Sequence, residues 1–178
     1  MNRTRLLPLV LAAPMSVFAY HPLQAMASEH GATCDGVAAT IVVTSSSPHV
    51  VHGTAHHDVI DIKNAGHVVR AGRGNDVICG SSGHDVIFGG AGNDDVQGNG
   101  GNDDIEGDDG NDDLSGGAGN DEINGGAGDD DIQGDEGNDQ LNGDSGDDTV
   151  QGDQGDDEVD GGQGSDDVSQ GDDQGTDG

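Results

Sequence analysis

The chain has 178 residues, a formal net charge of −31 and an aromatic content of only 2%. So few aromatic side chains cannot fill an ordinary globular core, and low hydrophobicity with high net charge is typical of disordered chains. The negative charge excludes nucleic acid and anionic membrane surfaces as favoured partners and leaves cations as the natural ones. Disorder is expected only if no repeat and no counter-ion organises the chain.

The N-terminus has the layout of a secretory signal peptide. Two arginines in the opening MNRTR precede an apolar run at 6–19, and a small-x-small cleavage site ends at Ala27. We expect cleavage after Ala27, with cleavage after Ala19 as the alternative, and a secreted, extracellular protein. A membrane anchor needs about 20 apolar residues, whereas this run is shorter and is interrupted by Pro8 and Pro14. No later stretch could span a membrane, so we expect no membrane insertion.

Two cysteines, Cys34 and Cys79, follow the predicted signal peptide. In an oxidising compartment an even number of cysteines favours a disulfide. The bond would close a loop of about 45 residues, for which the chain-entropy model gives about 4 kcal/mol of stabilisation. Two separately buried free thiols are the alternative.

Eleven unbroken nonapeptides occupy residues 71–169, and each has a branched aliphatic residue at position 8, an aspartate at position 6 and a glycine at position 4. The aliphatic residues are Ile78, Ile87, Val96, Ile105, Leu114, Ile123, Ile132, Leu141, Val150, Val159 and Val168. The aspartates are Asp76, Asp85, Asp94, Asp103, Asp112, Asp121, Asp130, Asp139, Asp148, Asp157 and Asp166. The nine-residue spacing also extends toward the N-terminus, in degenerate repeats, through Val69, Ile60 and Val51.

Each nonapeptide predicts a turn followed by a short strand. Positions 1 to 6 are rich in Gly, Asn and Asp, which tolerate positive φ, so we expect a tight turn with left-handed backbone at several points. Positions 7 to 9 predict a three-residue strand, whose position 8 faces inward because side chains alternate across a strand. A turn and a strand every nine residues make a solenoid in which two nonapeptides complete one coil. Stacked turns then bring carboxylates and carbonyls into an oxygen-only cage, which suits Ca²⁺ better than Mg²⁺.

The repeats, such as GGAGNDEIN at 116–124, resemble the RTX, or haemolysin-type, calcium-binding nonapeptide GGxGxDxUx. The resemblance implies an all-β fold, a right-handed parallel β-roll, with Ca²⁺ held between successive turns. It implies that the eleven aspartates named above are the side-chain ligands, helped by carbonyls of the turns. Eleven turns divide into columns of six and five, so at most about nine calcium ions fit between them.

We expect the fold to depend on calcium. The eleven repeats carry 29 acidic residues against the single base Arg73. Without counter-charge this block should be expanded and disordered, and metal binding then supplies folding free energy. We therefore expect an unfolded chain without Ca²⁺ and a β-rich chain with it.

The histidines offer a second possible metal site. Three of them, His49, His67 and His84, are expected in one column of turns, and three more lie nearby in sequence: His52, His56 and His57. Together they could bind Zn²⁺ or respond to pH. The alternative is that the histidines occupy degenerate repeat positions that no longer bind calcium.

The remaining segments frame the repeats. The apolar run at 38–43 predicts a first strand of an N-terminal cap, since a solenoid needs its open end covered. The tail lacks an aliphatic residue at the expected place, so we expect the last strand edge to be guarded mainly by charge. The predicted organisation is a signal peptide at 1–27, a cap segment at 28–52, degenerate repeats at 53–70, eleven calcium-binding repeats at 71–169 and a polar tail at 170–178.

The function predicted from these features is that of a secreted, non-enzymatic calcium-binding β-roll with a structural, adhesive or buffering role. The chain contains neither H-E-x-x-H nor G-x-S-x-G. One alternative is a non-catalytic remnant of an RTX toxin or exoenzyme. Another is a disordered acidic cation sponge, which the regular aliphatic spacing argues against.

Overall fold

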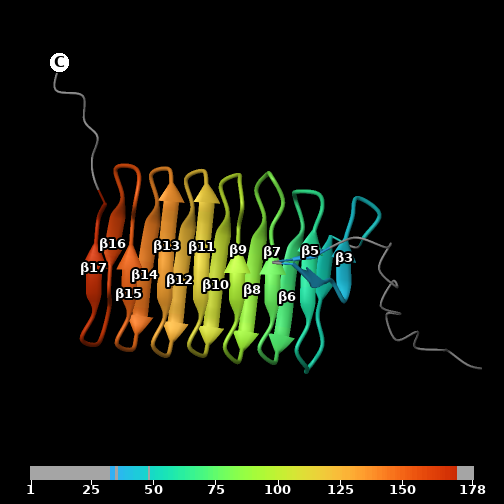
Figure 1. The fold of residues 1–178 in the computed structure, drawn as a ribbon, viewed down its shortest axis with the longest axis horizontal. Helices are drawn as coiled ribbons and strands as arrows, with labels where there is room; N and C mark the ends of the chain where they lie inside the picture. The colour runs from blue at the N-terminus through green and yellow to red at the C-terminus, as the bar shows by residue number, and fades with distance from the viewer. Residues whose placement is uncertain (1–32, 35, 48, 172–178) are drawn as a thin grey trace, which may run out of the picture.

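A computed structural model describes residues 33–34, 36–47 and 49–171. The predicted signal peptide lies outside these residues, as does all but the first two residues of the predicted polar tail. The described part contains only β-strands and turns, and none of it is a helix long and apolar enough to cross a membrane. Figure 1 shows the strands stacked side by side along one axis, in chain order from β3 to β17.

Successive strands alternate between two parallel sheets. One sheet has seven strands: β4 (Val50–His52), β6 (Val68–Arg73), β8 (Val86–Ala91), β10 (Asp104–Asp109), β12 (Glu122–Ala127), β14 (Gln140–Ser145) and β16 (Glu158–Asp160). The other has eight: β3 (Ile41–Val43), β5 (Val59–Ile62), β7 (Val77–Cys79), β9 (Asp95–Gln97), β11 (Asp113–Ala118), β13 (Asp131–Glu136), β15 (Thr149–Gln151) and β17 (Asp167–Ser169). The fold is the β-solenoid that the nine-residue spacing predicted.

The register between neighbouring strands confirms that two nonapeptides make one coil. Ile105 of β10 pairs with Ile87 on one side and Ile123 on the other, a step of 18 residues each way. Several strands are longer than the predicted three residues, because positions 1 to 3 of the next repeat continue the same ladder. In β12, for example, Gly126 and Ala127 still pair with the coil before.

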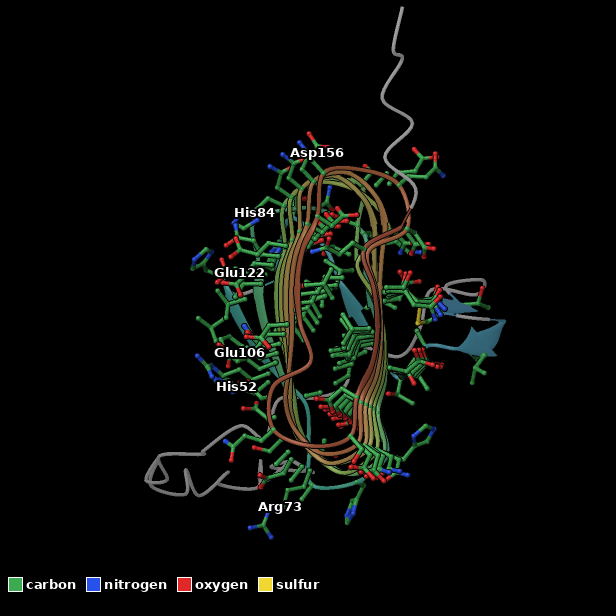
Figure 2. All side chains as sticks on the ribbon, turned by 90° about the vertical axis from the view of Figure 1, so that its left-hand side faces the viewer. His52, Arg73, His84, Glu106, Glu122 and Asp156 are labelled. Carbon is green, nitrogen blue, oxygen red and sulfur yellow. A yellow bond between two sulfur atoms is a disulfide. The ribbon has the colours of Figure 1, made fainter. Side chains whose placement is uncertain are left out.

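The aliphatic residues at position 8 form one continuous core between the sheets. From Ile78 to Val150 these side chains are at most 2% exposed. In Figure 2, viewed along the solenoid, they stack in rows inside the coil, while the outer-face residues Glu106 and Glu122 point away from it. The core opens only toward the C-terminal end, where Val159 is partly buried and Val168 is 42% exposed.

The N-terminal segment departs from the predicted single strand at 38–43. Its first residues belong to an antiparallel hairpin of β1 (Thr33–Cys34) and β2 (Val37–Ala38), and the solenoid begins only with β3. Thr40 lies between the hairpin and the first solenoid strand. Its hydroxyl and its backbone N–H both donate to the carbonyl oxygen of Val59, which attaches this junction to β5. The coil that follows is one residue longer than the others, since Ile41 pairs with Ile60.

The β1–β2 hairpin packs on the outer face of the eight-stranded sheet. Cys34 and Ala39 meet Val59 and Cys79 in a second small core, separate from the interior of the coil. Figure 2 shows the hairpin beside the coil rather than across its end. The N-terminal end of the solenoid is nevertheless closed, because Val43 is fully buried.

Candidate calcium-binding turns

The aspartates at position 6 line the inside of the two columns of turns that join the sheets. From Asp76 to Asp148 they are at most 3% exposed. One column holds Asp58, Asp76, Asp94, Asp112, Asp130, Asp148 and Asp166, and the other holds Asp85, Asp103, Asp121, Asp139 and Asp157. The structure thus gathers all eleven predicted aspartates into these columns and adds Asp58 of the worn repeats.

One oxygen of each carboxylate from Asp94 onward, and of Asp76, holds neighbouring coils together, whereas Oδ1 of Asp85 is buried without a donor. The backbone N–H of each position-6 residue donates to Oδ1 of the aspartate 18 residues later, as from Asp94 to Asp112 at 2.8 Å. This link recurs through both columns at 2.7–3.1 Å. Each coil is therefore fastened to the next by a carboxylate as well as by its strands.

The second oxygen of most of these carboxylates is buried without a hydrogen-bond donor. Within the described residues this is true of Oδ2 in nine of them: Asp76, Asp94, Asp103, Asp112, Asp121, Asp130, Asp139, Asp148 and Asp157. A buried carboxylate oxygen without a donor or a cation costs several kcal/mol, on the order of the desolvation of a charge. Nine such oxygens in regular rows would be stabilised by cations bound beside them.

Glycines at position 1 leave the space beside these Oδ2 atoms open, and glycines at position 4 allow the stacked turns to approach closely. A Cβ placed on Gly107 would lie 2.4 Å from Oδ2 of Asp112 and 2.5 Å from the carbonyl oxygen of Gly125 in the next coil. A Cβ on Gly110 would lie 1.8 Å from the carbonyl oxygen of Gly92. A Cβ at position 1 would thus fill the space beside Oδ2 and a carbonyl of the next coil, whereas a Cβ at position 4 would lie beside Oδ1 and a carbonyl of the preceding coil.

Position 2 supplies the predicted left-handed backbone. In ten of the eleven repeats the residue there has positive φ, whether it is Gly or one of the non-glycine residues Asn99, Asp108, Asp135, Asp144 and Asp153. Asn and Asp tolerate this conformation better than other side chains, which accounts for the restricted choice at this position. The exception is Ser81.

Ser81 and its counterpart Thr54 donate hydrogen bonds to Oδ2 of the first aspartate in each column. The backbone N–H and the hydroxyl of Ser81 both donate to Oδ2 of Asp85 at 2.8 Å. Those of Thr54 donate to Oδ2 of Asp58 at 2.7 and 2.9 Å. Neither contact was predicted from the sequence, although a hydroxyl residue four positions before the aspartate is a visible signal for both.

A second ladder, also missed from sequence, runs along the exposed side of the turns. The side-chain oxygen at position 5 accepts the backbone N–H of the residue 18 positions later, as between Asn102 and Asn120 at 3.1 Å and between Asn120 and Asn138 at 3.1 Å. These amide links require no metal. They explain why position 5 is mostly Asn or Asp even though it faces solvent.

Burial makes the inner carboxylates reluctant to ionise without a counter-charge. It raises the pKa of Asp94 and Asp103 to about 7, and that of Asp130 and Asp139 to about 6. Backbone hydrogen bonds to these carboxylates act in the opposite direction, while neighbouring aspartates of the same column raise the pKa further. A cation beside each Oδ2 would reverse this by favouring the charged form.

The donor set fits calcium. Oxygen ligands from a carboxylate and several backbone carbonyls are those that Ca²⁺ prefers. Across the described part of the chain no three His, Cys, Asp or Glu side chains gather into a metal site, so each turn contributes a carboxylate and its remaining ligands would be carbonyls. The same finding gives the histidine site no support: among these residues, Nδ1 of His67 contacts the carbonyl of Asn64 at 3.0 Å, and His57 and His84 contact the carbonyls of Asn75 and Asn102.

A family model described as the RTX calcium-binding nonapeptide repeat, in four copies, matches the chain repeatedly. The matched segments are 68–96, 80–114, 97–132, 106–141 and 133–168, which together cover more than half of the chain. The chain belongs to the RTX calcium-binding nonapeptide repeat family. No curated protein matches it. Membership identifies calcium ions as partners of this parallel β-roll and agrees with the free carboxylate oxygens of its turns.

The disulfide expected from the sequence is also present. Cys34 of the hairpin and Cys79 at position 9 of its repeat are bonded, with their Cα atoms 5.5 Å apart. Because Cys79 faces outward from β7, the bond ties the hairpin to the side of the roll. It lies at the N-terminal end of the roll, close in sequence to Asp76, the first aspartate with a free Oδ2.

Proposed function

We propose that this RTX chain is a secreted calcium-binding β-roll that folds when Ca²⁺ enters its stacked turns. The observation that carries the proposal is the set of nine buried Oδ2 atoms without donors. Each would bind a calcium ion together with glycine carbonyls of two successive coils. Of the eleven aspartates predicted as ligands, Asp166 lies in the more exposed last turn. Oδ2 of Asp85 accepts from Ser81, while its Oδ1 is buried without a donor. The remaining nine, from Asp76 to Asp157, are the ligands we propose.

The charge distribution explains why calcium would decide the fold. Residues 89–171 contain 27 acidic side chains and no Lys or Arg. Stacking these repeats at 18-residue intervals brings like charges together in every coil, which opposes folding. Nine divalent ions at the nine free oxygens would bring 18 positive charges into the columns. Calcium binding would then supply folding free energy directly.

The proposed setting is extracellular. The signal-peptide layout of residues 1–27 and the Cys34–Cys79 disulfide both support export to an oxidising compartment. Extracellular calcium modules work at Kd values of about 10⁻⁴–10⁻³ M, so the chain would stay unfolded in the cell and fold outside it. The role we propose is structural, adhesive or buffering, without catalysis.

A calcium titration of the chain from residue 28 tests this function. Circular dichroism in EGTA should show little β-structure, and added Ca²⁺ should produce one cooperative transition to a β-rich state. Equilibrium dialysis should reach saturation at about nine ions per chain, one for each free Oδ2. Gradual, non-saturating binding without a β transition would support the cation sponge instead. A β signal unchanged by EGTA would contradict the proposal.

A further inference from the structure

In the first carboxylate of each column Oδ2 is satisfied by protein groups, although Oδ1 of Asp85 is buried without a donor. Oδ2 of Asp58 accepts two hydrogen bonds from Thr54, and Oδ2 of Asp85 accepts two from Ser81. This is the atom that has no donor in the nine aspartates farther along. A buried oxygen that already accepts two hydrogen bonds needs no cation to offset its desolvation.

Backbone conformation separates the two kinds of turn. Asn99, 18 residues after Ser81 in the same column, has a φ of 70°, whereas Ser81 is outside the left-handed region. Outside the left-handed region, as Ser81 is, the N–H and the hydroxyl at position 2 both donate to the carboxylate four residues later. Coils with Gly, Asn or Asp in the left-handed conformation at this position leave the oxygen open.

The surrounding N-terminal region has its own sources of stability. It contains the disulfide and the second core of Cys34, Ala39, Val59 and Cys79. It also holds an ion pair between Lys63 and Asp61 at 2.5 Å. Residues 33–88 carry five acidic side chains against three basic ones, so like-charge repulsion is weak there. None of these features involves a metal.

We propose that residues 33–88 fold without calcium and form the template on which the calcium-dependent coils at 89–171 assemble. In a solenoid each coil contacts mainly its neighbours, so folding can start at one stable coil and propagate. The free edges of β7 and β8 would receive β9 and β10, their partners in the complete roll. The metal rows would then begin at Asp76 in one column and at Asp103 in the other. The template proposal rests on the proposed function only in taking the later coils to need calcium.

Hydrogen exchange of the whole, disulfide-bonded chain, followed by mass spectrometry in EGTA and in Ca²⁺, tests the template. In EGTA, amides of β3 to β7 and of residues 86–88 in β8 should remain protected, while those from β9 onward exchange freely. In Ca²⁺ all should be protected. Free exchange of β3 to β7 and of residues 86–88 in EGTA would overturn the template proposal. Protection from β9 onward in EGTA, or its absence in Ca²⁺, would instead overturn the proposed calcium-dependent function.

A matched pair of substitutions tests where the metal rows begin. Asp85→Asn and Asp103→Asn change neighbouring members of one column, both at most 2% exposed. Equilibrium dialysis should find one calcium ion fewer for Asp103→Asn and an unchanged number for Asp85→Asn. Loss of an ion from Asp85→Asn would overturn the assignment of Asp85 to the metal-free template.

The hydroxyl contact has its own control. Ser81→Gly removes the hydroxyl donor and keeps the backbone N–H, whereas Ser82→Gly changes an exposed neighbour in the same turn. In EGTA, Ser81→Gly should speed exchange at the amides of β8 by about tenfold or more, the effect of losing a hydrogen bond to a buried charge. Ser82→Gly should leave that exchange unchanged. Equal effects of the two variants would show that the hydroxyl contact does not stabilise the template.

Discussion

Two regions of the same solenoid, residues 33–88 and 89–171, differ in how they compensate the buried carboxylates of their turns. Both place aspartates inside their turns, except where His67 occupies that position, and in both Oδ1 links one coil to the next. In residues 33–88, hydroxyl groups close Oδ2 of two of the three carboxylates, and charges are nearly balanced. In residues 89–171, Oδ2 of the position-6 aspartates from Asp94 to Asp157 has no donor, and the segment contains no Lys or Arg. One backbone architecture can therefore be self-sufficient or metal-dependent, depending on the residue at position 2 and on the local charge.

The largest expected effect comes from a glycine in the stacked turns of the acidic region, compared with an open glycine of the N-terminal region. A Cβ on Gly119 would lie 1.4 Å from the carbonyl oxygen of Gly101, whereas one on Gly66 would meet nothing within 4 Å. Gly119→Ala should therefore abolish the calcium-induced β transition or shift its midpoint to far higher Ca²⁺. Gly66→Ala should cost only about 1–2 kcal/mol for a left-handed alanine. Urea unfolding in saturating Ca²⁺ measures both, and similar costs would contradict the assigned packing.

Reduction of the disulfide should affect the N-terminal region next most strongly. Opening the Cys34–Cys79 loop should cost about 4 kcal/mol on the chain-entropy model. In EGTA, a reductant should therefore remove the residual β signal that we assign to residues 33–88. In Ca²⁺ the roll should stay folded but require more calcium to form. Circular dichroism with and without reductant follows both effects, and a residual signal in EGTA that is indifferent to reduction would contradict the template.

Acid should partly replace calcium in the acidic region. Burial raises the pKa of Asp94 and Asp103 to about 7, so the folded ladder without calcium binds more protons than the unfolded chain. Its stability from these groups is present below about pH 4 and is lost as the pH rises toward about 7. The calcium-free chain should therefore gain β-structure on acidification from about pH 8 to about pH 4. In the presence of Ca²⁺, the midpoint concentration should rise as protons compete for the carboxylates.

The pH prediction is checked by circular dichroism in EGTA across that range. Ionic strength is held constant, because salt also screens repulsion between surface acids. A β signal that does not change between the two ends of the range would contradict the raised pKa values of the inner carboxylates. A calcium midpoint independent of pH would contradict their role as ligands.

The smallest effect is expected at the open C-terminal end. Val168 is 42% exposed, whereas Val150, 18 residues earlier in the same row, is fully buried. Val168→Ser should change the free energy of unfolding in Ca²⁺ by no more than about 0.5 kcal/mol. Val150→Ser should cost about 2–4 kcal/mol, because it places a hydroxyl in the core. Equal costs in urea unfolding would mean that the last coil is as well packed as the interior ones.

Periodicity made most of the fold predictable. A nine-residue spacing of aliphatics determines which side chains face inward, and hence that Ile87, Ile105 and Ile123 share one row. The spacing also placed the aspartates in two columns. Calcium as the partner followed from the oxygen-rich turns, and the family comparison supports it.

Features without periodicity were not predictable. The hairpin packs beside the sheet because Cys79 and Val59 face outward there, and no pattern in residues 33–39 indicates this. The longer first coil breaks the count of nines, since Ile41 pairs with Ile60. The hydroxyl contact of Ser81 depends on its departure from the left-handed conformation that the other position-2 residues adopt.

Anomalous X-ray diffraction from crystals grown with calcium tests the central claim most directly. Oδ2 atoms of the inner aspartates should each lie about 2.3–2.6 Å from a calcium ion. The ions should form two rows that start at Asp76 and Asp103, with none beside Asp58 or Asp85. Calcium bound instead to the exposed acids of the outer faces, such as Glu106 and Glu122, with Oδ2 of Asp94 and its counterparts free, would contradict the account.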